Sequence, residues 1–171
     1  TNLTAFFRES HHFDHLKEAI LTPMLSAGAP RIRVWSSACS SGEEPYSIAM
    51  TAIAAGAHRH RDFKILATDL DTNILARASN GVYPAERIKT APEALVKNAA
   101  RMLPSGDVAF TADAKDLITF RQLNLLHKWP VSGPFDAIFC RNVLIYFDTP
   151  TKRDIVDRLA HLLRPEGALY L

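Results

Sequence analysis

The chain has 171 residues, of which 47% are hydrophobic and 22% are charged, and this composition excludes disordered, collagen-like and disulfide-stapled proteins. A balance of 20 Lys and Arg against 18 Asp and Glu gives a net charge of +2, so we expect no nucleic-acid partner. No apolar run approaches the ~18 residues that span a bilayer, and no signal peptide opens the chain. We therefore expect one cytoplasmic domain without membrane insertion, large enough to bury a sizeable core.

The first third of the chain predicts a helical segment followed by a strand and a helix. Residues 4–25 indicate a helix or helix pair that packs outside a sheet, and residues 31–38 indicate the first strand. Ser41 and Glu44 then have the spacing of a capping box, which predicts a helix that Gly56 can end.

The middle of the chain repeats this succession of strand and helix. Residues 63–70 predict the second strand, Asp71 is placed to cap the next helix, and Gly81 can end that helix. A helical stretch at 93–102 follows, and residues 107–125 indicate two strands joined by a short turn, the second of which rejoins the main sheet near position 120.

The last third contains the most apolar strand. Residues 135–142 are branched and aromatic until Arg141 and Asn142, Pro150 opens a helix over 151–163, and 167–171 return as a strand. Strands that alternate with helices predict one α/β domain with a mostly parallel sheet. Two cysteines without C-x-x-C spacing indicate reduced structural thiols.

Small and polar residues follow the predicted strands, where an open parallel sheet binds its ligands. Glu43 and Glu44, in the first turn of a helix, disfavour a phosphate and favour a cationic ligand. The alternative interpretation is that Glu44 only completes the capping box.

Three further positions indicate a nucleoside. Asp69 can accept hydrogen bonds from ribose hydroxyls, Asn124 and Leu125 can hold an adenine, and Arg141 with Asn142 closes the cleft. Ribose, adenine and a positive group together describe S-adenosylmethionine better than NAD. Spacing alone leaves open a dehydrogenase that lacks its glycines.

Five segments carry a family resemblance: TNLTAFFRESHHF, RVWSSACSSGEEPYSIAM, ATDLDTNIL with its trailing NGVY, NLL, and FDAIFCRNVLIYFD. In this order, and over nearly the whole chain, they resemble the CheR-type chemotaxis receptor methyltransferases. The resemblance implies a Rossmann-like class I methyltransferase fold, with a mostly parallel sheet flanked by helices and a small antiparallel β-subdomain at about 103–121. It implies methyl transfer from S-adenosylmethionine to glutamate carboxylates of chemoreceptors. The expected products are the glutamyl 5-O-methyl ester and S-adenosylhomocysteine, with no metal.

The resemblance also implies roles for individual residues. It makes Arg8 and Tyr146 catalytic, with Arg8 holding one acceptor oxygen and Tyr146 near the point of methyl transfer. The cofactor contacts that it implies are Asn2, Thr4, Arg8, Glu44, Asp69, Asn124, Leu125, Arg141 and Asn142. His11 and His12 match the family as well, and we assign them to structure because the reaction demands no histidine there.

The implied partners are the cytoplasmic helices of methyl-accepting chemoreceptors, with a receptor C-terminal peptide as a candidate at the β-subdomain. We expect a monomer, and we expect the family's N-terminal helical domain and last strands to be absent from this chain. The alternative function is a non-catalytic signalling module that binds S-adenosylmethionine or S-adenosylhomocysteine. An NAD-dependent oxidoreductase is disfavoured because the G-x-G-x-x-G fingerprint is missing.

Overall fold

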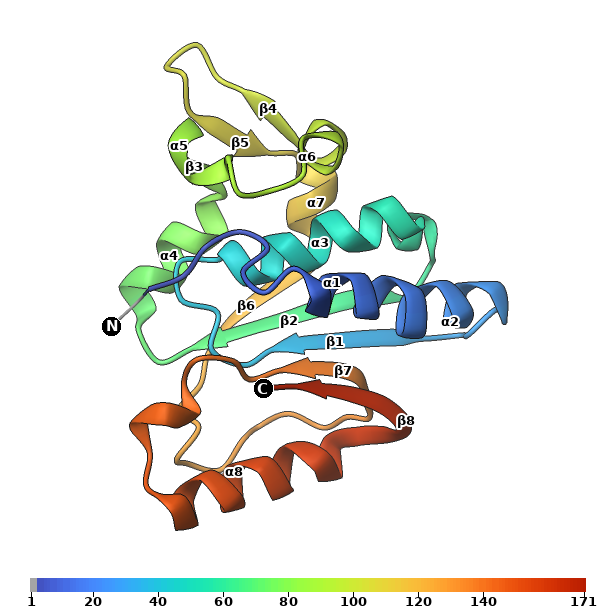
Figure 1. Cartoon of the computed structure of the whole chain (residues 1–171), viewed down its shortest axis with the longest axis vertical. Coiled ribbons are helices and arrows are strands. Elements are labelled where there is room, and N and C mark those ends of the chain that lie inside the picture. Colours follow the sequence, from blue (N-terminus) through green and yellow to red (C-terminus); the bar gives the residue numbers. More distant parts are fainter. Residues whose placement is uncertain (1–2) are drawn as a thin grey trace.

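A computed structural model describes residues 3–171 and has a five-stranded parallel sheet at its centre (Figure 1). The strands are β1 (Ile32–Ser36), β2 (Phe63–Asp69), β6 (Ile118–Gln122), β7 (Phe135–Phe139) and β8 (Leu163–Tyr170). Their spatial order is β6-β2-β1-β7-β8, and all four neighbouring pairs are parallel. The chain runs outward from β1 through β2 to β6 and then starts again at β7, so the strand order reverses between β1 and β7.

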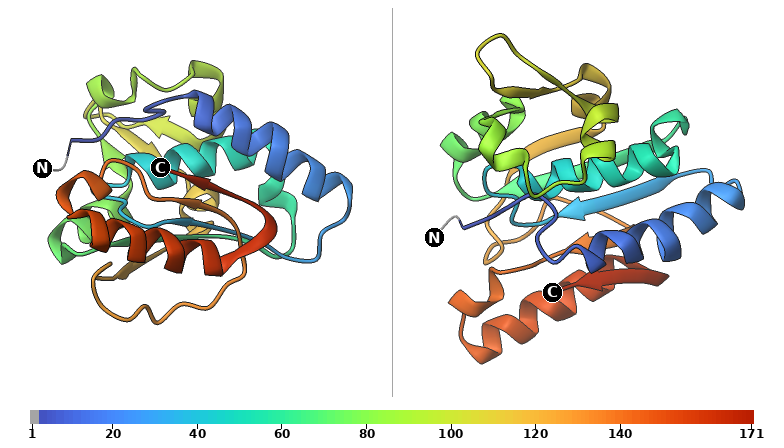
Figure 2. Two further views of the ribbon diagram at one scale, coloured as in Figure 1. Left: turned by 60° about the horizontal axis from the view of Figure 1, so that its bottom comes forward. Right: turned by 45° about the horizontal axis from the view of Figure 1, so that its top comes forward.

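Helices cover both faces of this sheet (Figure 1, Figure 2). The first face carries α3 (Glu43–Ala55), α4 (Thr72–Asn80) and one helical rod made of α1 (His11–His15), the π-helical η1 (Leu16–Leu21) and α2 (Thr22–Ser26). The opposite face carries α8 (Thr149–Leu162) and the loop between β6 and β7. The single-turn helices η2 (Ala57–Arg59) and η3 (Leu144–Tyr146) lie in connections.

Two hydrophobic layers hold these elements together. Ile32 and Val34 of β1 face the layer under the N-terminal rod and α3, whereas Trp35 faces the layer under α8. This alternation along one strand is the pattern expected where both faces of a parallel sheet are buried. Trp35 packs edge-on against Trp129 of the β6–β7 loop, with ring centroids 5.4 Å apart. Among residues 3–171, no helix combines the length and apolar character that crossing a membrane requires.

The predicted alternation of strands and helices is confirmed, including the N-terminal helix outside the sheet and the return of residues near 120 to it. Asp71 caps α4 by accepting hydrogen bonds from the backbone N–H groups of Asn73 and Ile74. Gly56 and Gly81 end α3 and α4 with φ angles of 84° and 69°.

The predicted capping box is wrong. Gly42, with a φ of 101°, stands at the N-cap of α3, and no side chain caps this helix. The Ser41 hydroxyl donates to the Glu43 carboxylate at 2.5 Å. Glu44 instead turns inward, where Ser36 donates to its carboxylate. A buried hydroxyl and a buried guanidinium each bind one oxygen of the Glu44 carboxylate, and these tertiary contacts override the local capping pattern.

The antiparallel subdomain exists, but its strands differ from the predicted stretch. Its sheet has the order β3-β5-β4, made by β3 (Val82–Tyr83), β5 (Val108–Phe110) and β4 (Ala100–Met102). The helices α5 (Ala85–Ile88), α6 (Glu93–Ala99) and α7 (Ala112–Asp116) flank it. Of the range 103–121, only β5 belongs to this sheet, and β6 belongs to the main sheet. Strands of two and three residues are too short for alternation to be recognised in the sequence.

Candidate functional site

A cavity of about 230 Å³ lies at the edge of the sheet where the parallel strands end. Its lining includes residues directly after β1, β2, β6 and β7, together with the N-terminal segment and η3. In Figure 1 these segments meet at the left edge of the molecule. The predicted site residues that line the cavity are Thr4, Arg8, Glu44, Asp69, Asn124, Leu125, Arg141, Asn142 and Tyr146. Asn2, the remaining one, lies outside the described residues.

Glu44 lies in the first turn of α3 and is 8% exposed. The Ser36 hydroxyl donates to its Oε1 at 2.6 Å, and Arg141 Nε donates to its Oε2 at 2.9 Å. A carboxylate oxygen can accept two hydrogen bonds, and each Glu44 oxygen has one described above, so Glu44 can accept further hydrogen bonds from the cavity that it lines. The carboxylate is thus fixed in place before any ligand arrives.

Arg141 links Glu44 to the N-terminal segment. Its Nη1 donates to the backbone carbonyl of Arg8 at 2.6 Å and to Nδ1 of His12 at 2.9 Å. Its guanidinium also lies over the rings of Phe13 and Phe139, at 5.2 and 5.6 Å from their centroids. With a side chain only 3% exposed, Arg141 is committed largely to partners within the protein.

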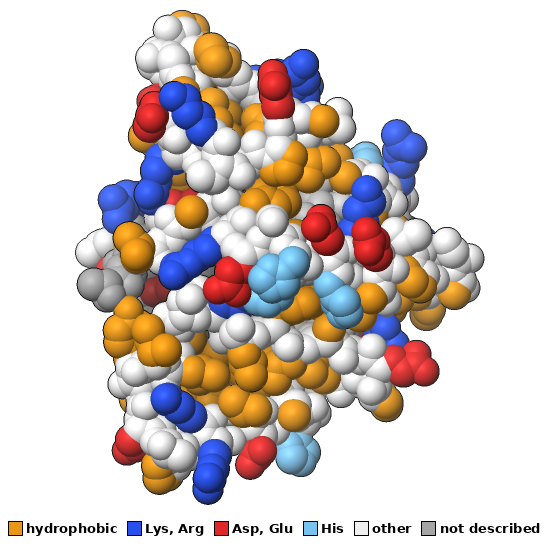
Figure 3. Space-filling model, viewed as in Figure 1, with side chains coloured by type: hydrophobic (Ala, Val, Ile, Leu, Met, Phe, Trp, Pro, Cys, Tyr) orange, Lys and Arg blue, Asp and Glu red, His pale blue; other side chains and the backbone are white. Residues whose placement is uncertain are grey.

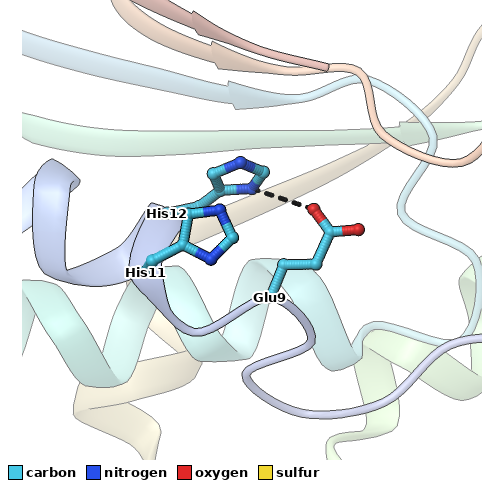
Figure 4. Close-up of side chains that lie close together, drawn as sticks. All are labelled: Glu9, His11 and His12. Atoms are coloured by element: carbon cyan, nitrogen blue, oxygen red, sulfur yellow. Dashed lines mark ion pairs between the residues drawn. The ribbon is translucent and has the colours of Figure 1, made fainter.

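Glu9, His11 and His12 form a close cluster (Figure 4), and two of its members, Glu9 and His12, contact Arg141. His12 Nδ1 lies 3.5 Å from Glu9 Oε2, and Arg141 Nη1 lies 3.8 Å from the same oxygen. Burial and the charge of Arg141 lower the pKa of His12 from its ordinary value. These residue types can ligate metals, but the Arg141 guanidinium already uses His12 Nδ1 and its charge opposes a bound cation. We therefore assign Glu9 and His12 to the bracing of Arg141.

Asp69, the last residue of β2, is oriented by two backbone N–H groups. Ser40 donates to its Oδ2 at 2.8 Å, and Asp71 donates to its Oδ1 at 3.1 Å. Ser40 also lines the cavity, and its own buried Oγ has no hydrogen-bond partner. A buried hydroxyl without a partner is costly unless a ligand or a water satisfies it.

The loop after β6 supplies Asn124 and Leu125. Asn124 Oδ1 accepts a hydrogen bond from the backbone N–H of Leu126 at 2.9 Å. The Leu125 carbonyl accepts from Trp129 Nε1 at 3.0 Å and from Arg158 Nη1 at 3.1 Å. The Arg158 guanidinium lies 3.8 Å from the centroid of the Trp129 ring. These contacts tie the loop to α8 and hold both predicted residues at the cavity.

The N-terminal segment places Arg8 at the cavity through an unusual backbone. Phe7 and Glu9, on either side of Arg8, have φ angles of 54° and 55°. Phe7 N–H donates to the Ser47 hydroxyl at 2.9 Å, and Arg8 Nη1 donates to the Leu3 carbonyl at 2.7 Å. Among residues 3–171, the other non-glycine residues with positive φ are Ser40 and Asn142, which both line the cavity. Such backbone strain concentrates at functional sites.

Sequence reasoning missed part of the lining. Leu3, Ser37, Leu70, Leu123, Val143 and Phe147 also line the cavity, and all lie within two residues of predicted positions or in the same loops. Gly42, in the loop after β1, is not among the lining residues, and a Cβ there would lie 2.5 Å from the Tyr83 hydroxyl. Packing against Tyr83 and the φ of 101° together require this glycine.

A comparison with protein families finds a match to the family described as CheR methyltransferase, SAM binding domain, over residues 2–171. The chain is 46% identical to a probable chemotaxis protein methyltransferase of Rhizobium etli, covering 100% of this chain and 66% of the relative. It is 45% identical to chemotaxis protein methyltransferase 2 of Pseudomonas aeruginosa, covering 99% and 61%. It is 44% identical to the chemotaxis protein methyltransferase of Escherichia coli, covering 99% and 59%.

Solved structures show the same fold at low sequence identity. The methyltransferase domain of bacterial CtHen1-C matches with a TM-score of 0.50 and 16% identity, covering 90% of this chain and 62% of that one. PKMT2 from Rickettsia typhi matches with a TM-score of 0.50 and 16% identity, covering 81% of this chain and 20% of that one. The expected Rossmann-like methyltransferase fold is thereby confirmed.

Proposed function

The chain belongs to the CheR methyltransferase family, and from that membership we propose that it transfers a methyl group from S-adenosylmethionine to glutamate carboxylates of chemoreceptors. The products are then the glutamyl 5-O-methyl ester and S-adenosylhomocysteine. The observation that supports this proposal is the single cavity that gathers every predicted contact residue within 3–171. The chain spans 59% to 66% of the three curated relatives described above.

The polar groups around the cavity fit this cofactor. The buried Oγ of Ser40 lacks a partner, and the fixed carboxylates of Glu44 and Asp69 keep acceptor capacity. A ligand that carries both hydroxyls and a positive charge satisfies these groups. When bound, S-adenosylmethionine supplies a methyl group activated by a positively charged sulfur.

Each lining residue then has a role that follows from its contacts. Asp69 would accept hydrogen bonds from the ribose hydroxyls, and Asn124 and Leu125 would hold the adenine. Glu44 would favour the cationic part of the cofactor. Arg141 is a positioning residue, because its guanidinium contacts Glu44 and the Arg8 carbonyl.

The acceptor needs orientation more than activation. A glutamate with a pKa of about 4.3 is almost fully ionised at neutral pH, so no general base has to remove a proton. Arg8 would hold one carboxylate oxygen and restrict the direction from which the other attacks. Tyr146 lies at the same cavity and would contact the acceptor beside Arg8. Exclusion of water then strengthens these charged contacts.

The test is transfer of a labelled methyl group to a soluble cytoplasmic chemoreceptor fragment, with base-labile release of the label as the readout. Arg8→Ala is expected to lower kcat about 100-fold while the affinity for S-adenosylhomocysteine falls far less. Arg77→Ala, at an exposed position on α4, is the matched control and should leave both unchanged. Full kcat in Arg8→Ala would remove the role assigned to Arg8. Binding of the nucleotide without any transfer by the unsubstituted protein would indicate the signalling module instead.

The finer proposals concern partners and location. We propose that the small sheet accepts a receptor C-terminal peptide by strand addition, because β3 and β4 are its edge strands. Calorimetry with such a peptide tests this, since a protein that does not bind it contradicts the proposal.

We also propose that the protein acts as a monomer in the cytoplasm, where its acceptor helices lie. Sedimentation measurements test the monomer.

A further inference from the structure

Exposed hydrophobic side chains gather around the mouth of the cavity. Among residues 3–171, nine large hydrophobic side chains are exposed, and five of them belong to this region. Leu3, Leu70 and Tyr146 line the cavity, and Leu126 and Ile145 directly adjoin lining residues in sequence. We call these five residues the apolar rim.

The apolar rim is built from four separate loops. Leu3 comes from the N-terminal segment, Leu70 follows β2, Leu126 follows β6, and Ile145 and Tyr146 belong to η3. In Figure 3 hydrophobic side chains lie at the left edge of the molecule, where Figure 1 places the N-terminal segment and the turn after β7. Isolated exposed hydrophobics are ordinary, whereas a group around one opening indicates an interaction surface.

We propose that the apolar rim is the surface on which the acceptor helix of a chemoreceptor lies while its glutamate enters the cavity. This inference rests on the proposed function and extends it to the mode of substrate recognition. The occupant is an amphipathic helix with apolar residues one turn before and after the modified glutamate. Those residues share a helix face with the glutamate, because positions three and four apart lie side by side.

Charge complementarity argues for this occupant. Among the described residues that line the cavity, Arg8 and Arg141 carry the positive charges, and Arg141 is buried against Glu44. Arg8 is half-buried and the only positive charge left for an incoming carboxylate among them. Arg8 lines the same cavity as Leu3 and Tyr146, and its Nη1 donates to the Leu3 carbonyl, so a segment whose carboxylate is directed toward Arg8 lies beside the apolar rim. The cavity and the apolar rim are thus complementary to a segment that has one carboxylate with apolar residues before and after it.

Ile145 is the best position for a test. It is 71% exposed and is not among the residues that line the cavity, so its substitution need not disturb the cofactor. Ile145→Asp and Ile145→Lys both remove the apolar contact and add opposite charges. Met102→Asp is the matched control, because Met102 is 73% exposed and does not line the cavity; it lies on β4, and a receptor fragment without its C-terminal tail leaves the peptide site proposed for that sheet unused.

The experiment measures methyl transfer to a soluble cytoplasmic chemoreceptor fragment that lacks its C-terminal tail, together with calorimetric binding of S-adenosylhomocysteine. Both Ile145 variants should raise KM for the fragment about tenfold, the scale of losing one well-packed interface side chain. Nucleotide affinity should stay within about twofold of the unsubstituted protein, and Met102→Asp should change neither quantity.

The outcomes separate the two proposals. If the unsubstituted protein methylates the fragment and the Ile145 variants have the same KM as Met102→Asp, the docking role of the apolar rim is overturned and the proposed function stands. If the unsubstituted protein transfers no methyl group, the proposed function fails first. If Ile145→Asp raises KM but Ile145→Lys keeps the KM of the unsubstituted protein, charge and not apolar contact governs docking, and the inference is overturned. A change in sedimentation on Ile145→Asp without a change in KM would assign the rim to a second copy of the chain.

Discussion

Replacing Arg141 tests whether the protein builds its cofactor site around a buried ion pair. Arg141 and Glu44 have side chains only 3% and 11% exposed, and their polar atoms lie 2.9 Å apart. Arg141→Met removes the guanidinium but keeps a side chain of similar length. Glu44 then loses its charged partner, and the Arg8 carbonyl and His12 lose a hydrogen-bond donor.

The expected cost follows from this burial. Removing one partner of a buried pair costs about 3–5 kcal/mol, because the remaining charge stays uncompensated. A domain has about 5–15 kcal/mol of stability in total, so Arg141→Met removes a large share of it. Arg141→Lys keeps the positive charge and is the less destabilising variant for the same comparison. Adding Glu44→Gln to Arg141→Met should recover part of the loss, with a coupling of about 1–3 kcal/mol.

The neighbouring residue of α3 supplies the control. Glu43 is fully buried and pairs with Arg87 at 2.6 Å, but Glu43 is not among the cavity-lining residues and the Arg87 side chain is 47% exposed. Arg87→Met also leaves a buried carboxylate without its charged partner, so it should likewise cost about 3 kcal/mol of stability, but this pair does not touch the cavity.

Urea unfolding measures both costs, and calorimetry measures the affinity for S-adenosylhomocysteine. Arg141→Met should weaken this affinity about tenfold or more, since Glu44 loses its orientation, whereas Arg87→Met should leave it unchanged. Unchanged affinity in folded Arg141→Met, or an equal loss of affinity in Arg87→Met, would refute the positioning role of Arg141.

Three further predictions concern packing, pH and thiol chemistry. Gly42→Ala should cost more than about 3 kcal/mol in urea unfolding because its Cβ would lie 2.5 Å from a tyrosine hydroxyl, whereas Gly106→Ala, with open space and a φ of 91°, should cost about 1 kcal/mol. Equal costs would contradict this packing argument. Burial and Arg141 lower the pKa of His12 in the folded protein, so the unfolded chain binds more protons and stability falls as pH drops below the ordinary value of 6.5. His12→Asn keeps a hydrogen-bond acceptor, and the unfolding free energy of this variant should fall less than that of the unsubstituted protein between about pH 7.5 and about pH 5. If both proteins lose the same unfolding free energy over this range, His12 does not contribute to the pH dependence. Burial raises the pKa of Cys140 to about 11, so a thiol reagent should label it only after unfolding, and rapid labelling of folded protein would contradict its burial.

The main sheet could be predicted because its strands are long and apolar and end at polar residues. Residues 135–139 are buried without a break, and Asp71, Gly56 and Gly81 act through local hydrogen bonds and φ angles that a sequence displays directly. The small sheet lacks those signals. Its strands are held by pairing partners from separate parts of the chain, such as Tyr83 with Val108, and not by their own periodicity.

The positions after the strands were predictable for a topological reason. Residues that end parallel strands share one edge of the sheet, and Asp69, Asn124 and Asn142 meet there as expected. The partners of Glu44 were not predictable, because Ser36 and Arg141 reach it only after β1 and β7 pair. The same residue pattern that indicates a local cap thus supports a buried tertiary contact instead.

Arg8 shows why the site cannot be reduced to its motifs. Its neighbours Phe7 and Glu9 adopt positive φ, a conformation that costs about 1–2 kcal/mol for each non-glycine residue. The compensating hydrogen bonds are long-range: the Phe7 N–H donates to the Ser47 hydroxyl, across 40 residues, and Arg141 Nη1 donates to the Arg8 carbonyl, across 133 residues. Because no local interaction supplies them, the segment can hold Arg8 at the cavity only when α3 and β7 are already in place. The Arg8 position is therefore a product of the folded domain, and loosening Arg141 should disturb the acceptor side and the cofactor side of the cavity together.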